Sequence, residues 1–169
     1  MPVDDPLSNA LQKDSGPDDA ADQDPVRFYR DTIMRHSVEP VGYRVAIAAT
    51  HSAEQYNPLC GDRIRLSFEV VDQRIHQAAF DGEACAMCLA SASLLCEGAP
   101  GGTIGELQAR RRWLEQALNS TQAVTSPAQP ALLPLLGVKR FPSRVKCVLL
   151  PWVAAADALS NPTQPGPDT

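Results

Sequence analysis

The hydrophobic pattern of this chain changes its period at Gly82. Before Gly82, the segment RIRLSFEVV (63–71) alternates apolar and polar residues, which is typical of a strand with one buried face. Asp72-Gln73 joins it to RIHQAAFDG (74–82), and so short a connection predicts an antiparallel pair of strands. After Gly82, residues 84–97 are rich in Ala, Leu and Cys and contain no β-branched residue, which predicts a helix.

The residues before these strands predict one more helix and one more strand. Asp24-Pro25 suits the N-cap and the first position of a helix that we expect to end near His36. RVAIAAT (44–50) is the expected first strand, and HSAEQYNPLCGD (51–62) is the expected loop after it.

Between position 97 and the C-terminal tail, the sequence predicts further helical segments separated by breaks. Thr103 and Glu106 form a capping box that opens a helix. The segment 126–138 is broken by prolines and predicts short helical turns, and FPSR (141–144) predicts a stop before a last helix over 145–159. The large apolar residues that we expect the capped helix to direct toward the core are Leu107, Trp113, Leu114 and Leu118, and we expect an irregularity in the last helix at Pro151.

This order of elements predicts an α+β fold, in which a small three-stranded antiparallel sheet has its helices packed on one face. The chain has 169 residues, enough for one domain with tails. Residues 1–23 are acidic and rich in Asp, Pro and Ser, so we expect this tail and the tail 160–169 to be disordered. The ordered domain is then expected over 24–159.

Charge and composition exclude several function classes. The net charge is −5, the pI is near 5.1 and aromatics make up 5% of residues, which argues against nucleic-acid partners. No apolar run approaches the roughly 20 residues needed to cross a bilayer, so we expect no membrane association. The N-terminus has no apolar core of a secretory signal, so we expect a cytoplasmic protein.

The cysteines carry the chemistry that the sequence suggests. There are five, an odd number, and a reducing compartment disfavours structural disulfides. Cys60, Cys85 and Cys147 each lie where one expected element meets the next, so they can converge at one end of the sheet. With Asp62 they offer three thiolates and a carboxylate, which suits Zn²⁺ or iron.

Each cysteine taken alone could instead be a buried packing residue, since free cysteine is among the most buried residue types. Cys60 fits that interpretation least, because Asn, Pro, Gly and Asp surround it in a polar turn. Cys88 and Cys96 fit it best, since both lie in the apolar helix over 84–97. Cys85-x-x-Cys88 matches a zinc-ligand spacing, but without a second pair it is a weak signal.

Three stretches together resemble a known family. NPLCGDRI, FDGEACAMCLASASLL and GVKRFPSRVKCVLLPW are similar to the three cysteine motifs of the IscU/NifU-N/SufU family of iron–sulfur cluster assembly proteins. YRDTIMRH resembles the N-terminal helix of that family, so that the resemblance runs from about residue 26 to 159. It implies the same fold of a three-stranded sheet with helices on one face.

The resemblance is greater to the SufU branch than to the IscU branch. Cys85 and Cys147 are 62 positions apart, which is similar to the SufU spacing with its extra helical segment, here expected at about 107–136. Lys146 stands where the IscU branch has a histidine. FPSRVK stands where that branch has its chaperone motif Leu-Pro-Pro-Val-Lys, which disfavours a chaperone partner. Cys88 departs from the SufU pattern, which has a small residue there.

The resemblance implies a zinc-dependent sulfurtransferase that relays sulfur and is not a stand-alone enzyme. Zn²⁺ would be held by Cys60, Asp62, Cys85 and Cys147. Cys60 would accept persulfide sulfur from a PLP-dependent, SufS-like cysteine desulfurase and pass it to a downstream iron–sulfur scaffold.

Other readings of the same residues remain. The cysteines would also suit a scaffold that assembles a labile [2Fe–2S] cluster, and a zinc-stabilised interaction domain would need them only for folding. Arg144 and Lys146 flank Cys147, where they either form a solvated rim or steady the anionic thiolates and guide a partner. A metal-sensing DNA binder is disfavoured by the negative net charge.

Overall fold

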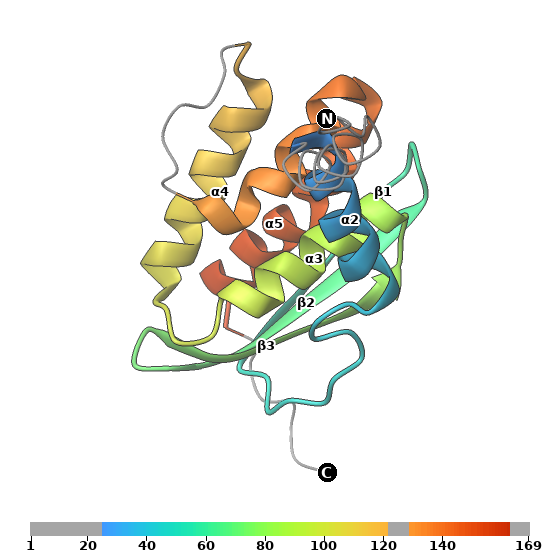
Figure 1. The fold of residues 1–169 in the computed structure, drawn as a ribbon. Coiled ribbons are helices and arrows are strands. Elements are labelled where there is room, and N and C mark those ends of the chain that lie inside the picture. Colours follow the sequence, from blue (N-terminus) through green and yellow to red (C-terminus); the bar gives the residue numbers. More distant parts are fainter. Residues whose placement is uncertain (1–24, 122–128, 163–169) are drawn as a thin grey trace, which may run out of the picture.

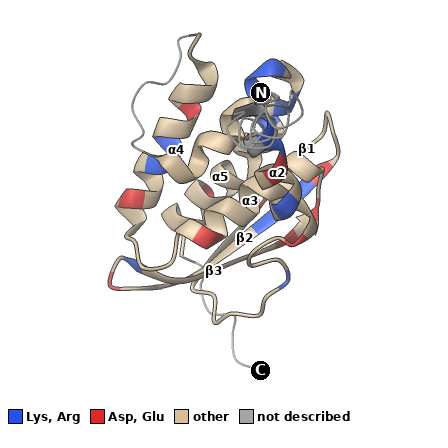
Figure 2. Ribbon diagram, viewed as in Figure 1, with Lys and Arg blue, Asp and Glu red and all other residues tan. Residues whose placement is uncertain are grey.

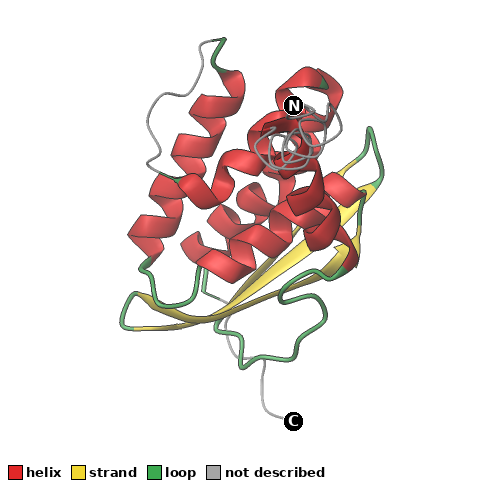
Figure 3. Ribbon diagram, in the orientation of Figure 1, coloured by secondary structure: helices red, strands yellow, loops and turns green. Residues whose placement is uncertain are grey.

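The computed structural model describes residues 25–121 and 129–162, and its helices all cover the same face of a three-stranded sheet (Figures 1 and 3). The strand order is β1-β2-β3, and both pairs are antiparallel. The strands are β1 (His51–Asn57), β2 (Asp62–Val71) and β3 (Arg74–Glu83). The predicted α+β fold is therefore confirmed. The expected tail 1–23 lies outside the described residues, as does 122–128 within the expected insertion. Of the expected tail 160–169, residues 163–169 also lie outside them, but its start was wrongly predicted, because Ser160 ends α5 and Pro162 forms a bridge with His51.

The alternation in β2 decides which face of the sheet is buried. Ile64, Leu66 and Phe68 are completely buried beneath the helices, while the arginines between them, Arg63 and Arg65, are exposed on the opposite face. The two-residue turn that leads into β3 has both residues in the left-handed region, which matches the twist of a tight hairpin. The predicted pairing of the two strands is thus confirmed.

The first strand does not lie where the sequence predicted it. Residues 44–50 form a connection, and β1 begins at His51, inside the expected loop. The short turn after Asn57 explains the difference, because it folds His51–Asn57 back onto β2 and pairs Asn57 with Asp62. Local hairpin closure outweighs the greater hydrophobicity of 44–50.

The connection 44–50 carries the chain from one edge of the sheet to the other, on the side away from the helices (Figure 1). At the β3 edge the Arg44 N–H donates to the Phe80 carbonyl at 2.8 Å, and at the β1 side the Thr50 N–H donates to the Phe68 carbonyl at 2.8 Å. Ala79 is buried on this outer face, which shows that part of the face is covered.

Five helical segments of the described chain form the layer over the sheet. They are α2 (Pro25–Val38), α3 (Ala86–Gly98), α4 (Ile104–Asn119), η1 (Pro130–Arg140) and α5 (Val145–Ser160), with a short turn η2 (Pro142–Arg144) before α5. The capping box at the start of α4 forms as predicted, and of the four apolar residues expected to face the core, all except the half-buried Trp113 are buried. None of the described helices combines the length and the apolar character needed to cross a membrane.

The last helix runs without interruption through Pro151, where the sequence predicted an irregularity. Pro151 lies inside α5 and is fully buried. The helix packs against β1, β2 and α3, and this packing offsets the loss of one backbone hydrogen bond at the proline.

A buried serine fixes α5 against α3. Ser91 Oγ donates to the Val148 carbonyl at 2.6 Å and accepts a hydrogen bond from Trp152 Nε1 at 3.0 Å. Because Val148 follows Cys147 directly, this contact sets the position of the last cysteine motif relative to the helix that begins after Cys85.

Candidate metal centre

The turn between β1 and β2 presents Cys60 at one end of the sheet. Asn57 organises the turn, because its side-chain oxygen accepts from the Leu59 N–H at 3.0 Å and its carbonyl accepts from the Gly61 N–H at 2.8 Å. Gly61 has φ +76°, a conformation that glycine adopts without strain. Cys60 is exposed at the tip of this turn, as the polar sequence around it predicted.

The two helix N-termini bring the other cysteines to the same end. Cys85 is the N-cap of α3, and Cys147 is the third residue of α5 and only 1% exposed. The sulfur atoms of Cys147 and Cys60 are 3.8 Å apart although 87 positions separate them in the chain. One ligand atom each from Cys60, Asp62 and Cys147 lie within 4.8 Å of one another.

The sulfur separation suits two thiolates that share one metal ion. A disulfide would bring the sulfurs to about 2.05 Å, and the structure keeps these cysteines free. In a tetrahedral zinc site with Zn–S bonds of about 2.3 Å, two sulfurs lie about 3.8 Å apart. The observed distance therefore fits a shared metal without rearrangement of either element.

Asp62 has one oxygen occupied and the other without a partner. It is 4% exposed, and its Oδ1 accepts from the backbone N–H of Cys85 at 2.9 Å. Its Oδ2 is buried and has no hydrogen-bond partner among the described residues. A buried carboxylate oxygen without a partner is costly, so it fits a position that a metal ion completes.

Two opposing effects set the pKa of Asp62. Burial by itself raises the pKa of this carboxyl, but the nearby Cys60 side chain, the hydrogen bond from the Cys85 backbone N–H and the nearby Cys85 side chain together lower it below its ordinary value. Asp62 is therefore held as a carboxylate, the form that binds metal.

Cys85 lies beside this tight group. Its backbone N–H donates to Asp62, but its sulfur does not belong to the set within 4.8 Å. Burial, followed by the charge of Cys85, raises the pKa of Cys147. Three of the four predicted ligands thus converge closely, and the fourth lies next to them at the start of α3.

A comparison with protein families identifies the fold that carries this site. Residues 28–147 match the model of the NifU-like N-terminal domain, which is most of the chain. This chain belongs to the NifU-like N-terminal domain family. The resemblance that the cysteine motifs suggested is therefore confirmed.

Curated relatives within the family carry two kinds of name. The chain is 31% identical over 127 residues to the zinc-dependent sulfurtransferase SufU of Bacillus subtilis, covering 75% of this chain and 86% of the relative. It is 29% identical over 137 residues to the iron–sulfur cluster assembly scaffold protein IscU of Streptococcus pyogenes, covering 79% of this chain and 84% of the relative.

Solved structures share the fold over nearly their whole length. A proposed iron–sulfur cluster assembly scaffold protein of the SUF system from Fervidobacterium islandicum matches with a TM-score of 0.67 at 29% identity, covering 76% of this chain and 94% of that one. A NifU-like protein from Brucella abortus matches with a TM-score of 0.71 at 21% identity, covering 78% and 92%, and supports the fold alone.

The two predicted supporting residues differ in their relation to this NifU-like site. Arg144 is the N-cap of α5, and the charge of Cys85, a hydrogen bond with its thiol and the charge of Cys147 raise the pKa of the guanidinium. The guanidinium therefore lies within electrostatic reach of the thiols. Lys146 is exposed, and its role stays a prediction.

The two remaining cysteines are packing residues, as predicted. Cys88 and Cys96 are both buried in α3. Burial raises the pKa of Cys96 to about 12. The pKa of Cys88 is raised by burial first and then by the charge of Asp62, so Cys88 lies behind the site as a neutral thiol.

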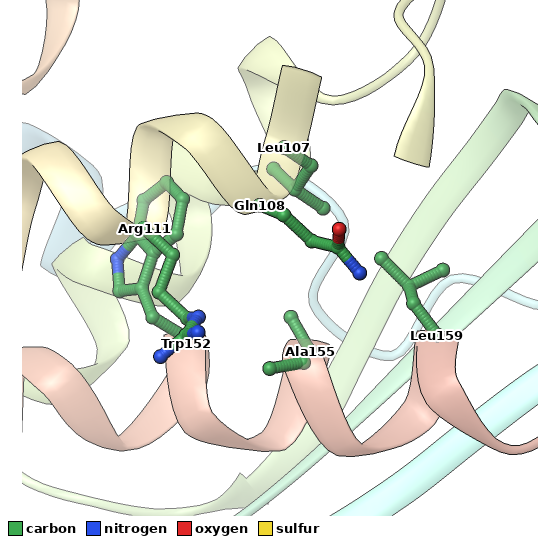
Figure 4. A pocket seen from close by; sticks show the side chains of 7 residues that line it. Leu107, Gln108, Arg111, Trp152, Ala155 and Leu159 are labelled. Carbon is green, nitrogen blue, oxygen red and sulfur yellow. The ribbon is translucent and has the colours of Figure 1, made fainter. Parts of the chain in front are cut away.

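Sequence reasoning missed two other hollows of the described surface. A small apolar pocket of about 10 Å³ lies between α4 and α5, where Leu107 and Gln108 of α4 and Trp152 and Leu159 of α5 line it (Figure 4), and it is lined by no cysteine, histidine or carboxylate. An open depression of about 580 Å³ lies on the outer face of the sheet, where Glu54 pairs with Arg63 and Arg65. The arginines that alternate with apolar residues in β2 were the signal that could have located this depression.

Proposed function

We propose that this chain is a zinc-dependent sulfurtransferase that accepts persulfide sulfur from a PLP-dependent, SufS-like cysteine desulfurase and passes it to an iron–sulfur scaffold. The observation that carries the proposal is the convergence of Cys60 and Cys147 at 3.8 Å around a buried Asp62 oxygen without a partner among the described residues. The name of the Bacillus relative supports it, since that protein is a zinc-dependent sulfurtransferase. We place this function in the cytoplasm, where the free cysteines would stay reduced.

Four residues would hold the zinc ion, namely Cys60, Asp62, Cys85 and Cys147. Zinc would supply a charge that keeps thiols deprotonated, without redox chemistry of its own. The set contains one exposed member and a buried pair, Asp62 and Cys147, so the site would have a fixed inner side and an accessible outer side.

Cys60 is the acceptor in this proposal because it is the exposed thiol on a turn. Its thiolate attacks the terminal sulfur of the donor's persulfide, a bond forms between Cys60 Sγ and that sulfur, and the donor cysteine leaves as a thiolate. The sulfur keeps its proton, so that Cys60 carries a persulfide and no electrons are gained or lost overall. Arg144 would steady the remaining thiolates, since it caps the helix that carries Cys147 and the charges of Cys85 and Cys147 raise the pKa of its guanidinium.

A second candidate function is a scaffold that receives iron and sulfide and builds a [2Fe–2S] cluster as cargo on the same cysteines. The names of the Streptococcus and Fervidobacterium relatives favour it, since both describe iron–sulfur scaffolds. The ligand set suits both functions, because thiolates bind zinc and iron–sulfur clusters. A zinc-stabilised interaction domain is the third candidate, in which the metal serves only the fold.

The metal content of protein purified without added metal separates these functions. We expect about one zinc per chain and stimulation of a cysteine desulfurase by wild type that is lost in Cys60→Ala. A coloured iron–sulfur chromophore without stimulation would instead establish the scaffold. Bound zinc without any effect on the desulfurase would favour the zinc-stabilised interaction domain. Protein that contains no metal would refute all three candidate functions.

A further inference from the structure

The stretch before Cys147 has a charge opposite to that of the whole chain. No Asp or Glu occurs from residue 116 to 156, whereas the chain as a whole has a net charge of −5. This stretch contains the segment KRFPSRVK (139–146), which we call the basic segment, and its cations are Lys139, Arg140, Arg144 and Lys146. In Figure 2 the coil of η1 and η2 carries blue and no red.

The cations of the basic segment are not neutralised by the folded domain. Elsewhere in the described chain, arginines such as Arg44 and Arg111 form ion pairs with carboxylates. Within the same described residues, no cation of the basic segment forms one. Arg140, Arg144 and Lys146 are exposed, so their charge is available to a partner.

An aromatic residue lies in the middle of these charges. Phe141 is 61% exposed, although a free aromatic surface of this size is unfavourable in water. Its backbone is fixed, because its N–H donates to the Val138 carbonyl at 2.7 Å and its carbonyl accepts from the Arg144 N–H at 2.8 Å. A rigid, exposed aromatic ring among arginines has the composition of an interface hot spot.

The basic segment borders the thiol cluster. It runs directly into the first turn of α5, which contains Cys147, and Arg144 is the N-cap of that helix. The turn that presents Cys60 carries a second exposed apolar side chain, Leu59, which is 82% exposed. A protein that reaches Cys60 therefore meets apolar surface and positive charge close to the thiols.

We propose that the basic segment is the docking surface for the sulfur donor, and that this donor presents an acidic rim around an apolar pocket that takes Phe141. The inference rests on the proposed function and names the chemistry of its partner surface. The exposed apolar side chains favour a protein over a nucleic acid, whose backbone needs a wider field of positive charge. Unpaired positive charge on an otherwise acidic chain steers an acidic partner to this end of the molecule.

Two charge variants of the full chain test the electrostatic part. Lys139→Glu/Arg140→Glu reverses half of the basic segment and avoids the thiol contacts of Arg144. Arg30→Glu/Arg112→Glu is the matched control, because both residues are exposed and lie on α2 and α4. Each substitution changes the charge by −2, so both double variants have a net charge of −5 − 4 = −9.

The measurement is the affinity of each variant for a purified SufS-type cysteine desulfurase by titration calorimetry, at about 50 mM and about 500 mM salt. We expect the Lys139/Arg140 variant to bind on the order of tenfold more weakly at low salt and to lose most of its salt dependence. We expect the control to bind like wild type. Phe141→Ala is expected to weaken binding about tenfold at both salt concentrations, since its contribution is apolar.

A small persulfide donor separates failure of docking from failure of the proposed function. Cysteine hydropersulfide needs no docking surface, so we expect all four proteins to accept its sulfur at the same rate. If none accepts sulfur from it, the proposed function is wrong. If all accept sulfur and both double variants bind the desulfurase equally, the docking inference is wrong.

Two other occupants of the surface would also overturn the inference. Residues 1–24 contain seven Asp and one Lys. If deletion of these residues gives desulfurase binding that no longer depends on Lys139 and Arg140, the basic segment serves the chain's own acidic segment. If a fluorescent single-stranded oligonucleotide binds through the same residues and the desulfurase does not bind, the surface serves nucleic acid.

Discussion

Asp62 links the fold to the metal site through its two oxygens. Oδ1 accepts the N–H of Cys85 and so fixes the start of α3, while Oδ2 is buried without a hydrogen-bond partner among the described residues. One side chain thereby positions a proposed ligand and is itself a proposed ligand. The two roles can be separated, because an amide keeps a hydrogen-bond acceptor but loses the negative charge.

Asp62→Asn and Asp62→Ala are expected to differ in stability and to agree in metal binding. Both should lose most zinc affinity, since the carboxylate ligand is gone. Asp62→Ala should also lower the free energy of unfolding by about 1–3 kcal/mol, because the Cys85 N–H loses its partner. Chelator competition and urea unfolding of the apo proteins measure the two effects.

Asp81→Asn is the control for these variants, since Asp81 is an exposed carboxylate that pairs with Arg44 at 3.1 Å. It should retain zinc affinity and change stability by less than about 1 kcal/mol. Wild-type zinc affinity in Asp62→Ala would contradict the assignment of Asp62 as a ligand.

His36 is a buried titratable group far in sequence from the cysteines. Its Nδ1 lies 2.7 Å from Ser93 Oγ, and Glu97 lies 3.6 Å from its Nε2. Burial lowers its pKa from the ordinary 6.5, against the raising effect of Glu97, and Arg35 lowers it further. The unfolded chain therefore binds a proton at a pH where the folded chain does not.

The stability of the protein is expected to fall as the pH drops below 6.5, the ordinary pKa of His36, because protonation then favours the unfolded state. The fall continues until the pH reaches the lower pKa of the folded protein. Urea unfolding between about pH 7.5 and pH 5.5 measures the free energy of unfolding at each pH. His36→Gln should flatten the slope of this free energy against pH. His76→Gln replaces an exposed histidine and should keep the slope of wild type; equal slopes in all three proteins would contradict the role of His36.

At the scale of elements, the site depends on how α3 and α5 meet. Both helices begin beside the thiols, and Ser91 joins them through Val148 and Trp152. The turn after β1 contributes Cys60, and Asp62 follows it as the first residue of β2. The site is thus assembled from three element ends, and movement of one helix would separate the sulfurs.

Ser91→Ala is expected to destabilise the protein by about 1–3 kcal/mol, because the buried Trp152 N–H loses its acceptor. Adding Trp152→Phe removes that donor, so the double variant should lose less than the sum of the two single variants. Ser160→Ala is the control, since Ser160 is an exposed serine of α5 whose hydroxyl donates to the Ala156 carbonyl. Denaturant unfolding measures the four variants and wild type, and strict additivity would contradict the coupling.

At the scale of the whole molecule, the metal is expected to stabilise the fold, since its ligands come from segments separated by up to 87 positions. Zinc removal by a chelator should lower the melting temperature of wild type. Cys147→Ser should already melt at the lower temperature and respond little to the chelator. Calorimetric melting with and without chelator measures this linkage.

Cys88→Ala is the control for this experiment, because Cys88 is completely buried in α3 and is assigned to packing. It should lose some stability to the cavity that it leaves and still respond to the chelator like wild type. Loss of the chelator response in Cys88→Ala would instead make Cys88 a ligand, together with Cys85 in the C-x-x-C spacing.

The sequence by itself determined the strands with strong alternation, the helices with clear caps and the identity of the thiols. Residues 63–82 specify a hairpin because period two and a two-residue turn agree, and Thr103 with Glu106 specifies a helix start through local hydrogen bonds. Cys60 and Asp62 were recognisable because a thiol and a carboxylate in a polar turn do not suit a core. In each case the information lies within a few neighbouring residues.

Tertiary structure alone decided the features that depend on distant partners. His51–Asn57 is a strand although it is more polar than 44–50, because β2 lies within reach of the short turn that follows it. The helix α5 passes through Pro151 because its neighbours bury it. Within the part of the chain that the structure describes, one buried oxygen of Asp62 has no partner, because Cys85 donates only to the other one. Local sequence cannot encode these outcomes, since burial and long-range hydrogen bonds exist only once the segments have met.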